Sequence, residues 1–199
     1  MKSKLTLLIA AALLSGQAFA HEPGTWMGRV GITNVDPKSD NSDIVDADAG
    51  AALNLNAVYF FNENWAVDIL AAIPFNHDIE LKDGTKVGET DQLPPTVSIQ
   101  YHFPNSGNFY PYVGLGVNYT TFFSEETTGP LAGTELVLDD SFGLAAQIGA
   151  DWRLNENWFL NFDARWMDID TDAEVRGADL AFEVEIDPLV YGFSLGYQF

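Results

Sequence analysis

The last eleven residues of the chain alternate without a break between large apolar side chains and mostly small or polar ones. The first set is Leu189, Tyr191, Phe193, Leu195, Tyr197 and Phe199, and the second is Val190, Gly192, Ser194, Gly196 and Gln198. A period of two residues predicts a β-strand with one apolar face. An apolar, aromatic-tipped face toward lipid and a narrow face toward a lumen are typical of the closing strand of an outer-membrane barrel. Such strands commonly end in Phe, so we expect Phe199 to be the signal for the barrel-assembly machinery.

The same alternation predicts eight strands along the chain. Their ranges are 26–34, 52–61, 65–73, 93–103, 109–123, 141–154, 158–167 and 188–199. Each can supply the roughly 9–11 residues that a tilted strand needs to cross a bilayer. Residues 61–65 and 154–158 share the ending Asn-Glu-Asn-Trp and predict tight polar turns between antiparallel strands. We therefore expect an all-β fold, a transmembrane eight-stranded antiparallel up-and-down β-barrel that acts as a monomer.

Four long polar segments, 35–51, 74–92, 124–140 and 168–187, alternate with the short connections. Short turns at one end and long loops at the other are the asymmetry of an outer-membrane barrel, whose short turns lie in the periplasm. An even number of strands then places both chain termini in the periplasm. The localisation expected from this pattern is the bacterial outer membrane.

Charged residues inside the predicted strands all fall on the lumen-facing positions. They are Arg29, Asp68, Asp151, Arg153, Asp163 and Arg165. A charge on the lipid face would be costly, so this distribution supports the assigned facing. Three Arg residues against three Asp residues predict paired charges that plug the lower lumen, because unpaired buried charges are expensive. Eight strands leave room only for side chains or one small ligand, so a continuous water-filled pore is not expected.

Tryptophan residues cluster near the ends of the predicted strands. Trp26, Trp65, Trp152 and Trp158 lie near the periplasmic ends, and Trp166 lies near an extracellular end. This placement predicts two aromatic girdles at the membrane interfaces.

The N-terminal residues have the pattern of a secretory signal. Lys2 and Lys4 precede an apolar run over residues 5–14, and Ala18-Phe19-Ala20 forms a small-x-small cleavage site. We expect residues 1–20 to be a signal peptide and residues 21–199 to form a single barrel domain. No later stretch approaches the roughly 20 apolar residues of a transmembrane helix.

The formal net charge is −20, and 23 of the 29 acidic residues lie in the four long segments. Such a surface argues against nucleic acid, which requires basic patches. It also faces outer-membrane lipid and lipopolysaccharide, and divalent cations could bridge the two surfaces. A calcium loop beginning at Asp168 is rejected, because its sixth position is Ala173 and its twelfth is Asp179. We therefore expect neither a metal site nor a cofactor.

Catalytic chemistry finds little support in the sequence. His77, followed by Asp78, is the one His at the extracellular end, and neither Ser nor Cys lies near it in sequence. His102 faces the lumen at the periplasmic end. Nucleotide-binding and zinc-ligand spacings are also missing from the sequence. The chain is therefore interpreted as a non-enzyme.

Proline residues flank the second long segment on both sides. Pro74 ends the third predicted strand, and Pro94 and Pro95 open the fourth. Because proline supplies no N–H to a β-ladder, pairing between these neighbouring strands should fail near the extracellular end. These prolines either terminate strands above the hydrocarbon or border a lateral exit from the barrel into the bilayer.

Several strings of this sequence resemble the outer membrane protein W family of eight-stranded barrels. The matching stretches are 70–77, 93–96, 111–123, 166–171 and 187–188, together with 196–199. The resemblance covers essentially the whole chain and implies passage of small hydrophobic molecules across the outer membrane. The family includes alkane-uptake proteins and phage or colicin receptors. The alternative is a structural or surface-interaction barrel that acts through its acidic extracellular loops.

Overall fold

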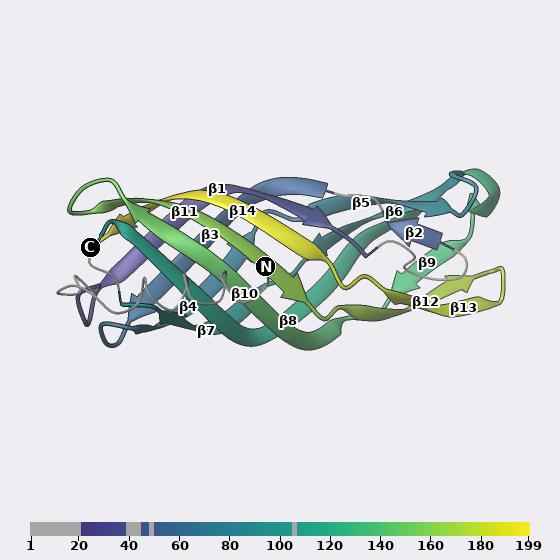
Figure 1. Ribbon diagram of the computed structural model, residues 1–199. Helices are drawn as coiled ribbons and strands as arrows, with labels where there is room; N and C mark the ends of the chain where they lie inside the picture. Colours follow the sequence, from purple (N-terminus) through teal and green to yellow (C-terminus); the bar gives the residue numbers. More distant parts are fainter. Residues whose placement is uncertain (1–20, 39–44, 48–49, 105–106) are drawn as a thin grey trace, which may run out of the picture.

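A computed structural model describes residues 21–38, 45–47, 50–104 and 107–199 and shows a closed β-barrel (Figure 1). Eight antiparallel strands form the wall in the order β1-β3-β4-β7-β8-β10-β11-β14, and β14 pairs with β1 to close it. The strands are β1 (Trp26–Asp36), β3 (Gly50–Phe60), β4 (Trp65–Ala72), β7 (Thr96–His102), β8 (Phe109–Thr127), β10 (Ser141–Arg153), β11 (Trp158–Met167) and β14 (Leu189–Gln198). The predicted eight-stranded antiparallel fold is therefore confirmed. The predicted signal peptide lies outside the described residues.

The strand connections make the two ends of the barrel different. One end, here called the short-turn end, carries the connections after β3, β7 and β10 and also the C-terminus (Figure 1). The repeated Asn-Glu-Asn-Trp turns share one geometry. The Asn62 side-chain oxygen accepts hydrogen bonds from the backbone N–H groups of Asn64 and Trp65, both at 2.9 Å. Asn155 does the same for Asn157 and Trp158, which explains the repeat as an Asx-type turn.

The opposite end, here called the long-segment end, is more ordered than the sequence predicted. The polar segments expected to be loops contain β2 (Val45–Ala47), β5 (Phe75–Leu81), β6 (Lys86–Leu93), β9 (Glu135–Leu138), β12 (Asp170–Arg176) and β13 (Leu180–Glu185), and a short 3₁₀ turn, η1 (Gly129–Leu131). In β12 the exposed residues Asp170, Asp172 and Glu174 alternate with buried neighbours. The high charge of these segments hid a period-2 pattern, so the loop interpretation is corrected.

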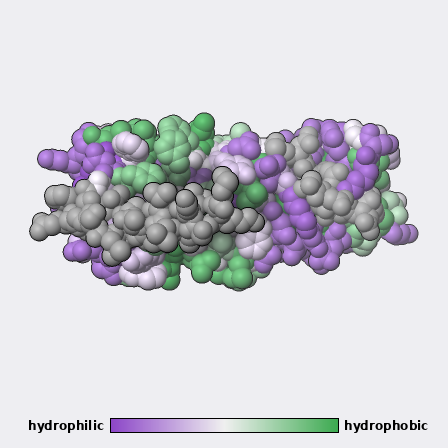
Figure 2. All heavy atoms as spheres, viewed as in Figure 1, coloured by the Kyte–Doolittle hydropathy of each residue, from purple (hydrophilic) through white to green (hydrophobic). Residues whose placement is uncertain are grey.

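The outer surface of the barrel is apolar around its middle. Large side chains that are 46–73% exposed include Val30, Ile32, Leu53, Leu55, Ile69, Ile99, Leu115, Phe142, Leu144, Ile148 and Phe162. In Figure 2 hydrophobic residues gather over the strands of the barrel wall, and the long-segment end is mostly hydrophilic. A surface belt of this size is stable only in an apolar environment. Within the described ranges, no helix is long and apolar enough to cross a bilayer.

The lumen is filled by side chains in three layers. An apolar cluster of Met27, Val58, Phe60, Ala66, Tyr110 and Phe159 lies toward the short-turn end. A second apolar cluster toward the long-segment end includes Leu70, Phe75, Phe122, Met167, Ile169 and Val190. Buried polar side chains such as Arg29, Asp68, Gln100 and Asp151 belong to neither cluster. They point inward from β1, β4, β7 and β10 and form the layer between the clusters.

Close approach of two strands makes Gly31 of β1 sensitive to substitution. A Cβ atom at Gly31 would lie 2.1 Å from the backbone oxygen of Phe193, whereas a Cβ at Gly28 would have no atom within 4 Å. We expect Gly31→Ala to lower the free energy of unfolding by about 1–3 kcal/mol, because the ladder must shift. Urea unfolding in detergent measures this, with Gly28→Ala as the control in the same strand. Equal stability of the two variants would contradict the close approach.

Candidate functional site

Two buried ion pairs cross the middle of the lumen. The Arg29 Nη2 atom lies 2.6 Å from Asp151 Oδ2, which joins β1 to β10. The Arg165 Nη2 atom lies 2.8 Å from Asp68 Oδ2, which joins β11 to β4. All four side chains are at most 3% exposed. Water therefore provides little screening, and each pair must be satisfied by its protein neighbours.

Amide side chains complete the bonding of both carboxylates. Asn161 donates to the second oxygen of Asp151 at 2.9 Å, and Asn56 donates to the second oxygen of Asp68 at 2.8 Å. Arg165 also donates to the Gln147 side-chain oxygen at 2.8 Å. With both oxygens of each carboxylate engaged, the polar layer is a connected network that fixes its charged members in place.

The other two predicted plug residues lie in different surroundings. Asp163 Oδ2 is 4.0 Å from Arg165 Nη2, at the outer limit of an ion pair. The Arg153 guanidinium lies over the rings of Tyr110 and Phe159, at 4.9 and 5.4 Å from their centroids. Arg153 is thus held by cation–π contacts at the short-turn end, because it is the last residue of β10. Three matched pairs were expected, and the geometry gives two close pairs.

An apolar cavity of about 50 Å³ lies above the polar layer, at the long-segment end. It is lined by Val45, His77, Ile79, Thr90, Gln92, Phe122, Leu136, Leu138, Thr171, Ala173, Phe182, Val184 and Ile186. Most of these side chains come from the short strands that the sequence did not predict. A larger solute must displace the lining, most of which belongs to strands outside the closed eight-stranded wall. The alternation of apolar or small residues with acidic ones over 171–175 and 182–186 is the sequence signal that could have revealed it.

The seam between β4 and β7 is interrupted next to this cavity. Its paired register ends at Leu70 and Thr96, and pairing resumes at Phe75 and Gln92 of the β5–β6 hairpin. Residues 71–74 and 93–95 lie between these rungs, and no pairing joins the two segments within the part of the chain that the structure describes. Each segment instead hydrogen-bonds to the strand on its other side, which is β3 for residues 71–74 and β8 for residues 93–95.

Two backbone hydrogen bonds show this outward bonding. Ile73 donates to the Leu53 carbonyl of β3 at 2.9 Å, and Tyr119 of β8 donates to the Pro95 carbonyl at 3.1 Å. Pro74 and Pro95 are exposed, whereas Pro94 is buried. β7 begins at Thr96 rather than at residue 93, because Pro94 and Pro95 offer no N–H to a ladder. The three predicted proline positions therefore border one interruption in the wall.

Side chains at the interruption connect the polar layer to the apolar cluster above it. The Thr96 hydroxyl lies 3.1 Å from the Pro94 carbonyl and 3.8 Å from Met167 Sδ. Asn118 Nδ2 lies 3.5 Å from the same sulfur atom. Leu70 and Met167 both belong to the upper apolar cluster. The break in the wall thus lies at the boundary where the charged network ends and the apolar interior begins.

The five tryptophans of the predicted girdles all face outward, with exposed fractions of 39–52%. Trp26, Trp65 and Trp158 begin their strands and Trp152 lies near the end of β10, all at the short-turn end. Trp166 lies near the other end of β11. Three of them pack against tyrosines of the neighbouring strand, in the pairs Trp26–Tyr59, Trp65–Tyr101 and Trp158–Tyr197.

Titratable groups outside the wall strands also occupy defined positions. His21 is buried among the rings of the lower apolar cluster, where its ring stacks on Phe60 with centroids 4.0 Å apart and also contacts Tyr110 and Phe159. Burial lowers the pKa of His21 to about 4, so its imidazole is neutral at pH 7. At the opposite end, the carboxylates of Asp168, Asp170 and Asp187 lie within 4.8 Å of one another. Burial and the two neighbouring carboxylates raise the pKa of Asp170.

Comparison with known proteins places this architecture among outer-membrane barrels. The chain is 41% identical to outer membrane protein W of Vibrio cholerae over 97% of each chain. The crystal structure of OprG from Pseudomonas aeruginosa has a TM-score of 0.84 at 36% identity and covers 92% of this chain and 99% of that chain. The solid-state NMR structure of AlkL in lipid bilayers has a TM-score of 0.70 at 25% identity, covering 93% and 94%. The OmpW family matches residues 22–199, and the chain therefore belongs to the OmpW family of bacterial outer-membrane β-barrels.

Proposed function

We propose that the protein assists the passage of small hydrophobic molecules across the outer membrane by a lateral route. A solute enters at the long-segment end and occupies the apolar cavity. It then leaves sideways into the bilayer past Pro94 and Pro95. In this arrangement the short turns and both termini face the periplasm, and the long-segment end faces the outside.

The observation that carries this proposal is the interrupted β4–β7 seam directly above the polar layer. A straight path through the lumen would require an apolar solute to separate two buried ion pairs, Arg29–Asp151 and Arg165–Asp68. Breaking such pairs is costly. Unpaired backbone is also costly in lipid, and Pro94 and Pro95 reduce that cost because they carry no N–H. A gap at this height gives the solute an exit that avoids the charges.

Filling the cavity tests the first half of the route. Ala173 of β12 is buried in the cavity lining, and Ala181 of the adjacent β13 is exposed. We expect Ala173→Phe to reduce the initial rate of uptake of a fluorescent hydrophobic tracer severalfold in cells that express the protein. The reason is that the ring occupies the space the solute needs. Ala181→Phe adds the same ring on the outer face and should leave uptake unchanged. Equal uptake through both variants, at equal amounts of folded protein, would contradict the cavity as part of the route.

A second candidate function is a surface-interaction role of the long-segment end. Its support is the acidic surface, including the cluster of Asp168, Asp170 and Asp187, which could meet lipopolysaccharide through divalent cations. Hydrophobic-tracer uptake separates the two functions. A surface-interaction barrel predicts the same uptake in cells with and without the protein, whereas the transport proposal predicts a clear difference.

The last part of the proposal concerns the export and assembly of the protein, its oligomeric state and its lack of catalysis. Residues 1–20 are removed as a signal peptide, and Phe199 engages the barrel-assembly machinery. The barrel acts as a monomer without catalysis and needs no cofactor for solute passage. The support for these statements is the sequence pattern at the two ends of the chain and the outer-membrane family to which it belongs.

A further inference from the structure

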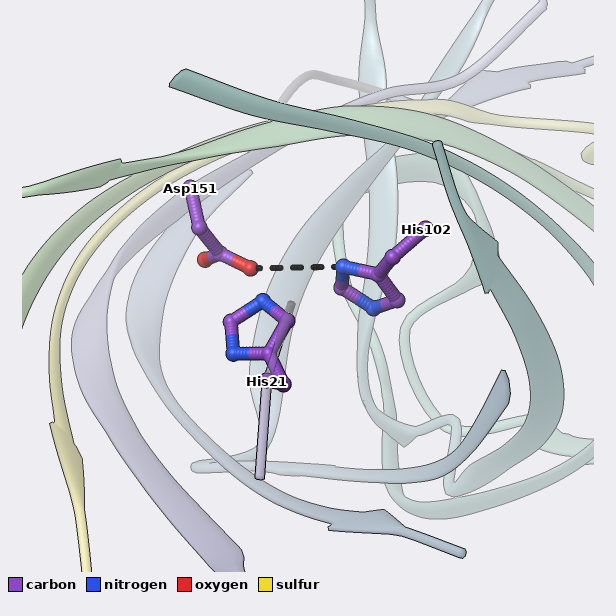
Figure 3. A group of neighbouring side chains, drawn as sticks. All are labelled: His21, His102 and Asp151. Carbon is purple, nitrogen blue, oxygen red and sulfur yellow. Dashed lines mark ion pairs between the residues drawn. The ribbon is translucent and has the colours of Figure 1, made fainter. Parts of the chain in front are cut away.

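Three metal-ligating side chains from distant parts of the chain meet inside the short-turn end of the barrel (Figure 3). His21 precedes β1, His102 ends β7, and Asp151 lies in β10. The His102 Nδ1 atom is 3.9 Å from Asp151 Oδ2, and each of the three residues offers one ligand atom within 4.8 Å of the others. All three residues are buried and at most 1% exposed. Neither sequence spacing nor any other motif predicted this meeting.

The two imidazole rings are each oriented by a glutamine on the side away from the cluster. His21 Nδ1 lies 3.2 Å from the Gln198 side-chain oxygen, and His102 Nε2 lies 3.0 Å from the Gln100 side-chain oxygen. Gln198 in turn donates through its Nε2 to Thr25 at 2.9 Å, which fixes its oxygen toward His21. A carbonyl oxygen can only accept, so each ring carries its proton on the nitrogen that faces the glutamine.

The opposite ring nitrogens therefore present lone pairs to the cluster. His21 Nε2 and His102 Nδ1 are both buried and have no hydrogen-bond partner among the described residues. The third group, Asp151, contributes a carboxylate oxygen beside them. Three electron-pair donors thus converge with no hydrogen donated to either imidazole. Buried polar atoms in proteins are normally satisfied, so this arrangement calls for a cation or a bound water. Orientation of a ligating His through its other ring nitrogen is the usual second shell of a metal site.

We propose that His21 Nε2, His102 Nδ1 and Asp151 Oδ2 form a binding site for a divalent transition-metal cation of the zinc type. Two imidazoles and one carboxylate suit Zn²⁺, Cu²⁺ or Ni²⁺ and do not suit Mg²⁺ or Ca²⁺, which prefer oxygen ligands. With three protein ligands, a tetrahedral ion keeps its fourth position for water. Donor atoms about 2.0–2.2 Å from the metal lie closer together than those here, so binding requires small side-chain movements.

The ion pair between Asp151 and Arg29 limits the metal affinity expected of this site. Asp151 Oδ2 also accepts from Arg29 at 2.6 Å, so the guanidinium competes with the metal for the same oxygen. Asp151 Oδ1 is held by Asn161 at 2.9 Å, which keeps the carboxylate aimed at the cluster. The nearby positive charge weakens cation binding, and the site is therefore an exchangeable one. A bound ion would join the segment before β1 to β7 and β10 at the short-turn end.

Zinc titration of untagged protein isolated from outer membranes tests the proposal. Competition with a chromophoric chelator at neutral pH should give one Zn²⁺ per chain, and Co²⁺ should give the visible absorption of a tetrahedral site. We expect His21→Ala and His102→Gln each to weaken zinc binding at least tenfold, because each removes one of three ligands. His77→Ala removes the third histidine of the chain, at the opposite end of the barrel, and should leave zinc affinity unchanged.

Three outcomes would overturn the site. The first is that the folded protein binds neither Zn²⁺ nor Co²⁺, which would assign the space to a bound water. The second is that His21→Ala binds zinc as tightly as the unaltered protein. The third is that His77→Ala loses as much affinity as His21→Ala. His21 lies outside the barrel strands, so its variant keeps the test valid even where His102→Gln fails to fold.

Discussion

Replacing Asp68 by alanine is expected to lower the free energy of unfolding by about 3–5 kcal/mol, because it leaves a buried guanidinium without its carboxylate. Arg165 Nη2 lies 2.8 Å from Asp68, and both side chains are at most 3% exposed. Asp151→Ala should have an effect of the same size through Arg29, which lies 2.6 Å away. Urea unfolding of the purified barrel in detergent micelles, followed by tryptophan fluorescence, measures the change.

Asp163 provides a matched control for this experiment. It approaches the same Arg165 nitrogen, at 4.0 Å instead of 2.8 Å, and its side chain is 12% exposed. Asp163→Ala should therefore cost clearly less than Asp68→Ala. Replacing both members of a pair, as in Arg29→Met with Asp151→Leu, should recover much of the loss from Asp151→Ala. If Asp163→Ala proved as destabilising as Asp68→Ala, the two close pairs would not be the structural centre of the lumen.

A disulfide across the interrupted seam is expected to abolish tracer uptake. Ala71 of β4 and Pro95 are both exposed, and each is the next residue beyond the last paired rung, Leu70–Thr96. Ala71→Cys combined with Pro95→Cys should form a bond under oxidation, since both positions adjoin the paired Leu70–Thr96 rung, which holds the two backbones close together. Closing this rung blocks the proposed route past Pro94 and Pro95. Reduction should restore uptake, which is measured with the hydrophobic tracer in the same cells.

A second disulfide one rung inside the paired seam serves as the control. Ile69 and Val97 are directly paired and are 46% and 47% exposed. Their cysteine variants should cross-link equally well and leave uptake unchanged, because the ladder is already closed there. Full uptake through the oxidised Ala71–Pro95 variant, with folding retained, would exclude the lateral route. Loss of uptake in both cross-linked proteins would mean that the effect is not specific to the gap.

The wall of the barrel follows from local sequence patterns. The alternation in residues 189–199 and seven similar segments predicted every strand of the closed sheet, with most boundaries within two residues. Lipid on one side and packed side chains on the other impose a strict period of two residues. This period does not depend on which strand is the neighbour in the sheet. The outward tryptophans and the inward charges follow from the same rule, since a one-residue shift would reverse both.

The extensions at the long-segment end were missed because charge dominated their composition. β12 alternates Thr171, Ala173 and Val175 with acidic residues, which is a strand pattern. When the alternating acidic residues are considered only as composition, without their spacing, the segment resembles a loop. The apolar cavity escaped prediction for the same reason, since its lining comes largely from these segments.

The sequence by itself determined the fold, the facing of each strand and the position at which proline must interrupt a ladder. Only the tertiary structure decided which inward groups meet. Arg29 and Asp151 are 122 residues apart, and their contact depends on the stagger with which the sheet closes on itself. That stagger sets the height of every inward side chain, so Asp68 rather than Asp163 becomes the close partner of Arg165. It also brings His21 to His102 and Asp151, because local periodicity fixes which side a residue faces but not its level around a closed barrel.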